Sequence, residues 1–113
     1  MSEQPGALST AFSAVPPQSI EAERSVLGAL LQDGRAVSIA MEMLQEDDFY
    51  TPAHREIYSA IRALAQQSTA VDLVTVDAEL SRRGTLNGVG GSSYLVELLQ
   101  YVPTTANVQY YRS

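Results

Sequence analysis

The chain lacks cysteine, lysine and tryptophan, and it has a single histidine among its 113 residues. Without cysteine there is no disulfide, no thiolate metal site and no cysteine nucleophile. All seven basic residues are arginine and stand against thirteen acids, which gives a net charge of −6. A chain of this charge repels phosphate backbones, so we expect no direct contact between this chain and nucleic acid.

Long apolar runs are also missing. No segment approaches the length of a membrane span, and the first residues lack the basic start and apolar stretch of a signal peptide. We therefore expect a cytoplasmic protein with no membrane partner. Residues 1–17 are rich in Ser, Ala, Gly, Pro and Gln, a composition that predicts a flexible tail. One ordered domain is expected over residues 18–105, and residues 106–113 are expected to begin a further helical segment.

Helix signals follow one another through the ordered part. Ser19, Thr51 and Asp72 stand where a side chain can cap a helix, and Pro52 suits a first helical position. Residues 71–76 are compatible with a strand, but the sequence offers no partner strand. The apolar spacing predicts helices over about 19–32, 35–44, 52–66 and 73–83, a fifth beginning at Ser92 or Ser93, and a sixth from Ala106. The fold class is therefore all-α, a compact bundle of about six helices.

His54 is the residue that would indicate chemistry. It falls at the edge of the apolar stripe of the helix over 52–66. A zinc site would need a cysteine or a second histidine, and nucleophilic catalysis would need a serine in a recognisable elbow. Neither is present. A metal- or histidine-dependent hydrolase remains an alternative only if His54 is exposed in a cleft with converging acids.

Glu23 suggests a structural partner for this histidine. Its side chain projects into the apolar stripe of the first helix, between Ile20 and Val26, where an unpaired carboxylate is costly. We predict that Glu23 meets His54 or Arg55 where the first and third helices pack. The alternative is that Glu23 reaches solvent at the start of its helix. In both cases Glu23, His54 and Arg55 are expected to be structural polar residues.

Two further clusters are interpreted as connections between helices. The acids Glu46, Asp47 and Asp48 are consecutive, whereas the ligands of a calcium loop alternate, so a solvated loop is favoured over a metal site. The glycine-rich segment 84–91 follows no strand and lacks the lysine of a phosphate-binding loop. We predict no catalytic residue, no metal site and no cofactor-binding site in this chain.

The tyrosines gather towards the end of the sequence. Tyr94 and Tyr101 are seven residues apart, which places them on one side of the fifth helix, beside its core stripe. Tyrosine is favoured at protein interfaces because an apolar ring carries a polar tip. Contact with a partner and an ordinary position at the edge of the core are both open for these two residues.

Six short motifs occur in one order along the chain. They are Pro16–Glu23 with Val26-Leu27-Gly28, Asp48-Phe49-Tyr50, Pro52-Ala53-His54, Val71–Val76, Gly90-Gly91 with Tyr94-Leu95, and Val102–Asn107. No single motif is specific. Their order and spacing together resemble the N-terminal domain of bacterial replicative DNA helicases of the DnaB type, over residues 16–112.

The resemblance implies a non-catalytic collar domain of a ring-forming helicase that unwinds DNA at the replication fork. In that family the motor that uses ATP and magnesium is a separate domain, and DNA is contacted through the whole parent protein. The collar docks the C-terminal domain of primase, contacts the other subunits of the hexamer and is linked to ring loading, which makes a helicase loader a further candidate partner. Residues 106–113 would begin a long helical hairpin that is cut off at Ser113.

No catalytic residue of the family carries over to this chain, so the candidate positions are on the surface. For partner contact we expect Glu21, on the first turn of the first helix, together with Tyr94 and Tyr101. A helix-turn-helix DNA-binding domain built on the third to fifth helices is the rival interpretation. The net charge opposes it, and Arg55 and Arg62 share a side of their helix without other cations.

Overall fold

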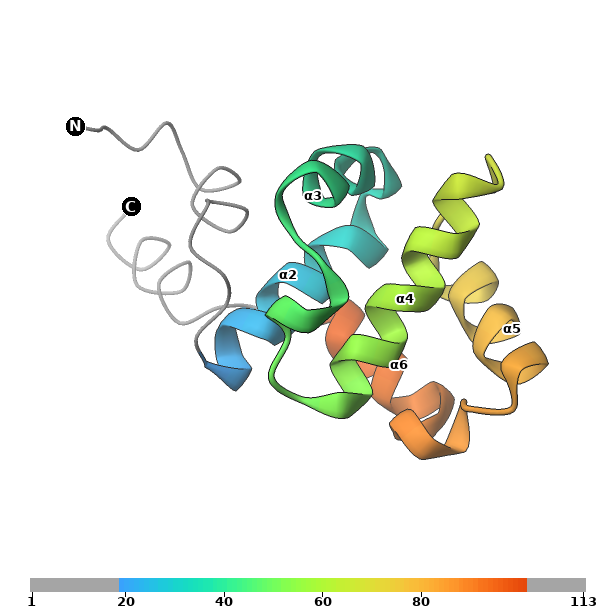
Figure 1. The fold of residues 1–113 in the computed structure, drawn as a ribbon. Helices are drawn as coiled ribbons and strands as arrows, with labels where there is room; N and C mark the ends of the chain where they lie inside the picture. The colour runs from blue at the N-terminus through green and yellow to red at the C-terminus, as the bar shows by residue number, and fades with distance from the viewer. Residues whose placement is uncertain (1–18, 102–113) are drawn as a thin grey trace, which may run out of the picture.

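The computed structural model describes residues 19–101, a chain of helices in which no strand occurs (Figure 1). The α-helices are α2 (Ile20–Gln32), α3 (Val37–Met43), α4 (Pro52–Gln66), α5 (Leu73–Arg83) and α6 (Gly91–Leu99), and the short 3-10 helices are η1 (Gly34–Ala36), η2 (Glu46–Asp48) and η3 (Asn87–Val89). The prediction of an all-α bundle is confirmed for this part of the chain. The tail predicted over 1–17 and the sixth helix predicted from Ala106 lie outside the described residues.

Several helix ends follow from local side chains. The Ser19 hydroxyl accepts a hydrogen bond from the Ala22 N–H at 3.0 Å and caps α2. Asp72 and Thr75 cap α5 reciprocally, each side chain bonding the backbone N–H of the other. Gly84 ends α5 in the left-handed conformation with φ of 77°, which glycine adopts without strain. These three ends agree with the sequence prediction.

Other boundaries differ from the prediction. The segment predicted as one helix over 35–44 is divided into η1 and α3, because the Asp33 carboxylate accepts from the Arg35 N–H and holds a tight turn there. Helix α6 starts at Gly91 without a side-chain cap, and the preceding Gly90 makes the turn at φ of 116°. The Ser92 hydroxyl therefore does not cap α6 and bonds instead to Asp77 on α5.

Helix α4 lies at the centre of the bundle and packs against α2, α3 and α5 (Figure 1). Two fully buried aromatic side chains fill the space beside it. The rings of Phe49 and Tyr58 lie 5.0 Å apart between centroids. The Tyr58 hydroxyl donates to the carbonyl oxygens of Ala40 at 3.2 Å and Leu44 at 2.9 Å, so this buried polar group is satisfied.

Helices α2 and α6 approach each other closely at Gly28. A Cβ atom at this position would lie 2.3 Å from the carbonyl oxygen of Leu98. The Gln32 side chain also donates to the Leu99 carbonyl at 2.7 Å. Only a residue without a side chain permits this separation, so Gly28 sets the distance between the two helices. No helix within 19–101 is both long and apolar enough to cross a membrane.

Candidate functional site

The carboxylate of Glu23 is the centre of a buried polar network. Its Oε2 accepts from the Tyr50 N–H at 2.6 Å, and its Oε1 accepts from His54 Nδ1 at 2.7 Å and from the Thr51 N–H at 3.4 Å. The side chain has no exposure to solvent. The network therefore joins α2 to the start of α4, and the alternative that Glu23 reaches solvent is wrong.

His54 extends this network to α6. Its Nε2 lies 2.6 Å from the hydroxyl oxygen of Tyr94, and the two rings are nearly parallel with centroids 5.9 Å apart. A carboxylate can only accept hydrogen bonds, so Nδ1 of His54 carries a proton towards Glu23. In the neutral imidazole Nε2 then accepts from the Tyr94 hydroxyl. Three helices distant in sequence are thereby connected through one histidine.

The electrostatics of Glu23 favour its ionised form. Burial raises the pKa of this carboxyl, but hydrogen bonds from His54, Tyr50 and Thr51 together lower the pKa below its ordinary value of 4.5. The negative charge also lies just before the N-terminus of α4, where a helix dipole stabilises an anion. Thr51 occupies the N-cap position of α4, but its side chain makes no capping hydrogen bond, contrary to the sequence prediction.

The two ionisable residues at the centre of the network, Glu23 and His54, are closed off from solvent. Only 1% of His54 is exposed, and both of its ring nitrogens are occupied by Glu23 and Tyr94. An open groove of about 800 Å³ lies elsewhere, between η1, α3 and the connection from α4 to α5. Its charged lining residues are Arg35, which is paired with Asp33, and Glu42. His54 is thus not in a cleft with converging acids, which the hydrolase interpretation requires.

The other predicted site residues lie around this network. Glu21 is exposed on the first turn of α2, as expected. Arg55 does not meet Glu23; its guanidinium donates to the Tyr50 carbonyl at 3.3 Å. Tyr94 is only partly exposed. Tyr101 lies beyond the end of α6 rather than on it, and its Cβ faces Gly28.

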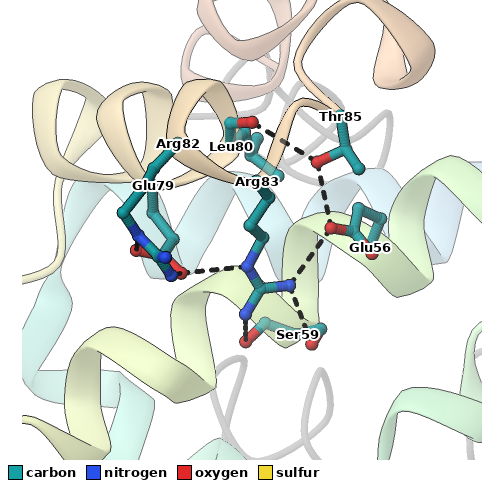
Figure 2. Close-up of polar contacts among 7 residues, drawn as sticks. All are labelled: Glu56, Ser59, Glu79, Leu80, Arg82, Arg83 and Thr85. Atoms are coloured by element: carbon teal, nitrogen blue, oxygen red, sulfur yellow. Dashed lines mark hydrogen bonds and ion pairs between the residues drawn. The ribbon is translucent and has the colours of Figure 1, made fainter.

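A second polar cluster, centred on Arg83, joins α4 to α5 (Figure 2). Its guanidinium donates to Glu79 at 2.9 Å, to Glu56 at 3.1 Å and to the Ser59 hydroxyl at 3.1 Å. Hydrogen bonds from Arg82 and Arg83 lower the pKa of Glu79 to about 2. The sequence prediction assigned Arg83 only to the end of its helix. The spacing of Glu79 and Arg83, four residues apart, was the available signal for their pairing.

The acids considered as a metal site bind different partners in the structure. Glu46 pairs with Arg62 on α4, and the Asp48 carboxylate accepts from the Gln45 N–H at 2.8 Å. Within residues 19–101, no group of three or more histidine, aspartate or glutamate side chains is arranged to hold a metal ion. The segment interpreted as a solvated loop forms a short 3-10 helix, η2, with Asp47 exposed and Asp48 capping the Gln45 N–H.

Comparison with known proteins finds relatives over most of the sequence. Residues 15–113 match the family model of the DnaB-like helicase N-terminal domain. The chain is 52% identical over 97 residues to the replicative DNA helicase DnaB of Geobacillus stearothermophilus, and 47% identical over 97 residues to the replicative DNA helicase DnaC of Bacillus subtilis. Each match covers 86% of this chain and 21% of the relative, so the chain spans about a fifth of their length.

A solved structure resembles the fold as well. The crystal structure of the N-terminal domain of DnaB helicase from Mycobacterium tuberculosis matches with a TM-score of 0.73 and 48% sequence identity. The match covers 85% of this chain and 67% of that chain.

Proposed function

This chain belongs to the DnaB-like helicase N-terminal domain family, and on that premise we propose that it is the non-catalytic interaction domain of a hexameric replicative DNA helicase. In this role it docks the C-terminal domain of primase and supports assembly of the ring with the other subunits. Unwinding of DNA, and the binding of ATP and magnesium, would be functions of the whole parent protein. We also propose that a helicase loader is a further partner of this domain and that the protein is located in the cytoplasm.

One observation in this structure supports a binding role rather than a catalytic one. The buried polar side chains Glu23 and His54 are engaged with each other and with the backbone before α4, and both are closed off from solvent. Such a network fixes the relative positions of helices, which is what a docking domain requires. The exposed residues around it then carry the contact with partners.

The rival role in direct DNA binding is opposed by the state of the arginines. Arg62 pairs with Glu46, so one of the two cations on this side of α4 is already neutralised. The net charge of −6 acts in the same direction. A salt-dependent gel shift with duplex DNA would be expected to show no complex.

Calorimetric titration of the primase C-terminal domain into this chain tests the proposal. We expect saturable binding by the wild-type chain and weaker binding by Glu21→Ala. Tyr94→Phe separates a partner contact made by the ring of Tyr94 from the hydrogen bond of its hydroxyl to His54, because it keeps the ring and removes the hydroxyl. No binding by the folded wild-type chain would overturn the primase assignment. Sedimentation of the parent protein with and without this domain would test its support of the ring.

A further inference from the structure

Tyr50 is the most exposed of the large apolar side chains within 19–101. Its exposed fraction is 84%, although the preceding Phe49 is completely buried. A single exposed aromatic residue is not unusual on a protein surface. The backbone of Tyr50, however, is held on both sides by hydrogen bonds with side chains of α2 and α4.

Both polar groups of the Tyr50 backbone are bound. The N–H donates to the buried carboxylate of Glu23 at 2.6 Å, and the carbonyl accepts from Arg55 at 3.3 Å. The neighbouring Phe49 ring is fixed in the core against Tyr58. The exposed ring is thus carried on a short segment with little conformational freedom. Such pre-organisation lowers the entropy lost when an aromatic anchor enters a partner's pocket.

The surroundings of Tyr50 combine an apolar group with charges of both signs. Figure 1 shows the start of α2 and the turn into α4 on the same side of the bundle, where the Glu23–Tyr50 hydrogen bond joins them. Ile20 is exposed one turn before Glu23 on α2. Asp47 in η2 is exposed and forms no ion pair within the described residues. The Arg55 guanidinium adds a cation at the Tyr50 carbonyl. Glu21 lies on another side of α2, the face that carries Gly28 and approaches α6.

We propose that Tyr50 is the anchor of the partner-docking surface, with Ile20 as its apolar neighbour and Asp47 as its acidic rim. The complementary partner presents an apolar pocket with lysine or arginine opposite Asp47, and the net charge of −6 repels a second copy of this chain. The inference rests on the proposed function in taking the primase C-terminal domain as this partner. It goes beyond the sequence prediction, in which Tyr50 occurs only within the motif Asp48-Phe49-Tyr50.

The test measures the affinity of the primase C-terminal domain for matched truncations of this chain. Tyr50→Ala removes the exposed ring and is expected to weaken binding at least about tenfold, as at an interface hot spot. Tyr50→Phe keeps the ring and should bind within about threefold of wild type. Val74→Ala is the control, because Val74 is 74% exposed on α5, away from this surface. Its affinity should equal that of wild type.

A charge variant tests the acidic rim. Asp47→Arg should weaken binding further at low salt than at high salt, because screening removes the contribution of exposed charges. Circular dichroism should show unchanged helix content in all four variants, since the substituted side chains are exposed.

The outcomes separate the inference from the proposed function. If wild type and Tyr50→Ala bind primase equally, the role of Tyr50 is overturned while primase docking stands. If the wild-type chain does not bind primase, both are overturned. If the chain forms a dimer that Tyr50→Ala dissolves, the surface belongs to a second copy and the inference is wrong.

Discussion

Replacement of Glu23 by glutamine tests the buried network most directly. Glutamine keeps the shape of the side chain and one acceptor oxygen. Its NH2 group replaces the second oxygen and faces a backbone or ring N–H, and two donors cannot form a hydrogen bond with each other. The carboxylate now accepts three hydrogen bonds, from Tyr50, Thr51 and His54. A buried donor left without a partner costs about 1–3 kcal/mol, and a hydrogen bond to a charged group contributes about 1.5–3 kcal/mol.

We therefore expect Glu23→Gln to lower the free energy of unfolding by about 3 kcal/mol at pH 7, the cost of lost hydrogen bonds to a buried carboxylate. Urea denaturation followed by circular dichroism at 222 nm measures this change. Glu21→Gln is the matched control, because it removes the same charge from the same turn of α2 at an exposed position. It should cost less than about 1 kcal/mol, the value of an acid near a helix N-terminus.

The pH dependence gives a second measurement of the same group. The pKa of Glu23 is lowered in the folded chain. Its contribution to stability is therefore fully present above the unfolded value near 4.5 and is lost as the pH falls through the folded value. The difference between wild type and Glu23→Gln should shrink below pH 4.5. A loss below about 1 kcal/mol at pH 7, or a loss independent of pH, would refute the role assigned to this carboxylate.

Three other changes have calculable outcomes. Gly28→Ala forces α2 and α6 apart, and the overpacking cost of about 3 kcal/mol should exceed the gain of about 1 kcal/mol in helix propensity. Gly88→Ala is the control, because its Cβ would meet no atom within 4 Å, and its urea midpoint should be unchanged or higher. Equal urea midpoints for the two variants would contradict the close approach of the helices at Gly28. Arg83→Ala should lower the free energy of unfolding by about 1–3 kcal/mol, more than Arg82→Ala, because the Arg83 side chain is 22% exposed and that of Arg82 is 69% exposed. A lower thermal midpoint for Arg82→Ala than for Arg83→Ala would exclude a stabilising link from Arg83 to α4. Tyr58→Phe should lower the free energy of unfolding by about 1 kcal/mol at pH 7. Burial raises the pKa of Tyr58 to about 12, so the free energy of unfolding of wild type should fall more steeply between pH 10 and 12 than that of the variant. Parallel pH dependences of the two would count against a buried hydroxyl.

The elements that the sequence predicts well are those fixed by neighbouring residues. Helix α4 has the predicted bounds, Pro52–Gln66, because its apolar period and the proline at its start act within a few turns. The end of α5 at Gly84 depends likewise on one local conformation. The resemblance to the helicase family is also confirmed, because ordered motifs retain their signal across the whole domain.

The burial of particular side chains was less predictable. Tyr58 is fully buried although it lies outside the narrow apolar stripe expected for its helix. The reason is that α4 is covered on several sides, and the carbonyls of Ala40 and Leu44 satisfy the hydroxyl from another part of the chain. Ile20, expected in the apolar stripe of its helix, is exposed because it is the first residue of α2.

The same distinction holds for the candidate site. A carboxylate within an apolar stripe indicates that a partner is needed, and the sequence narrows that partner to two neighbouring residues. It does not indicate that backbone N–H groups of the turn share the carboxylate, or that Tyr94 completes the network from α6. These contacts depend on how three helices pack, which no local pattern specifies.

The network from Glu23 through His54 to Tyr94 also affects the order in which the domain becomes rigid. Its two side-chain links join residues 31 and 40 positions apart in the chain. Individual helices form faster than contacts at such separations, because long loops must close first. The second link cannot form before α6 has docked on α2. The corner that carries Tyr50 depends on the first link, because the Glu23 carboxylate binds both His54 and the Tyr50 N–H. A chain in which α2 has not yet docked on α4 therefore does not present the Tyr50 ring in its fixed position.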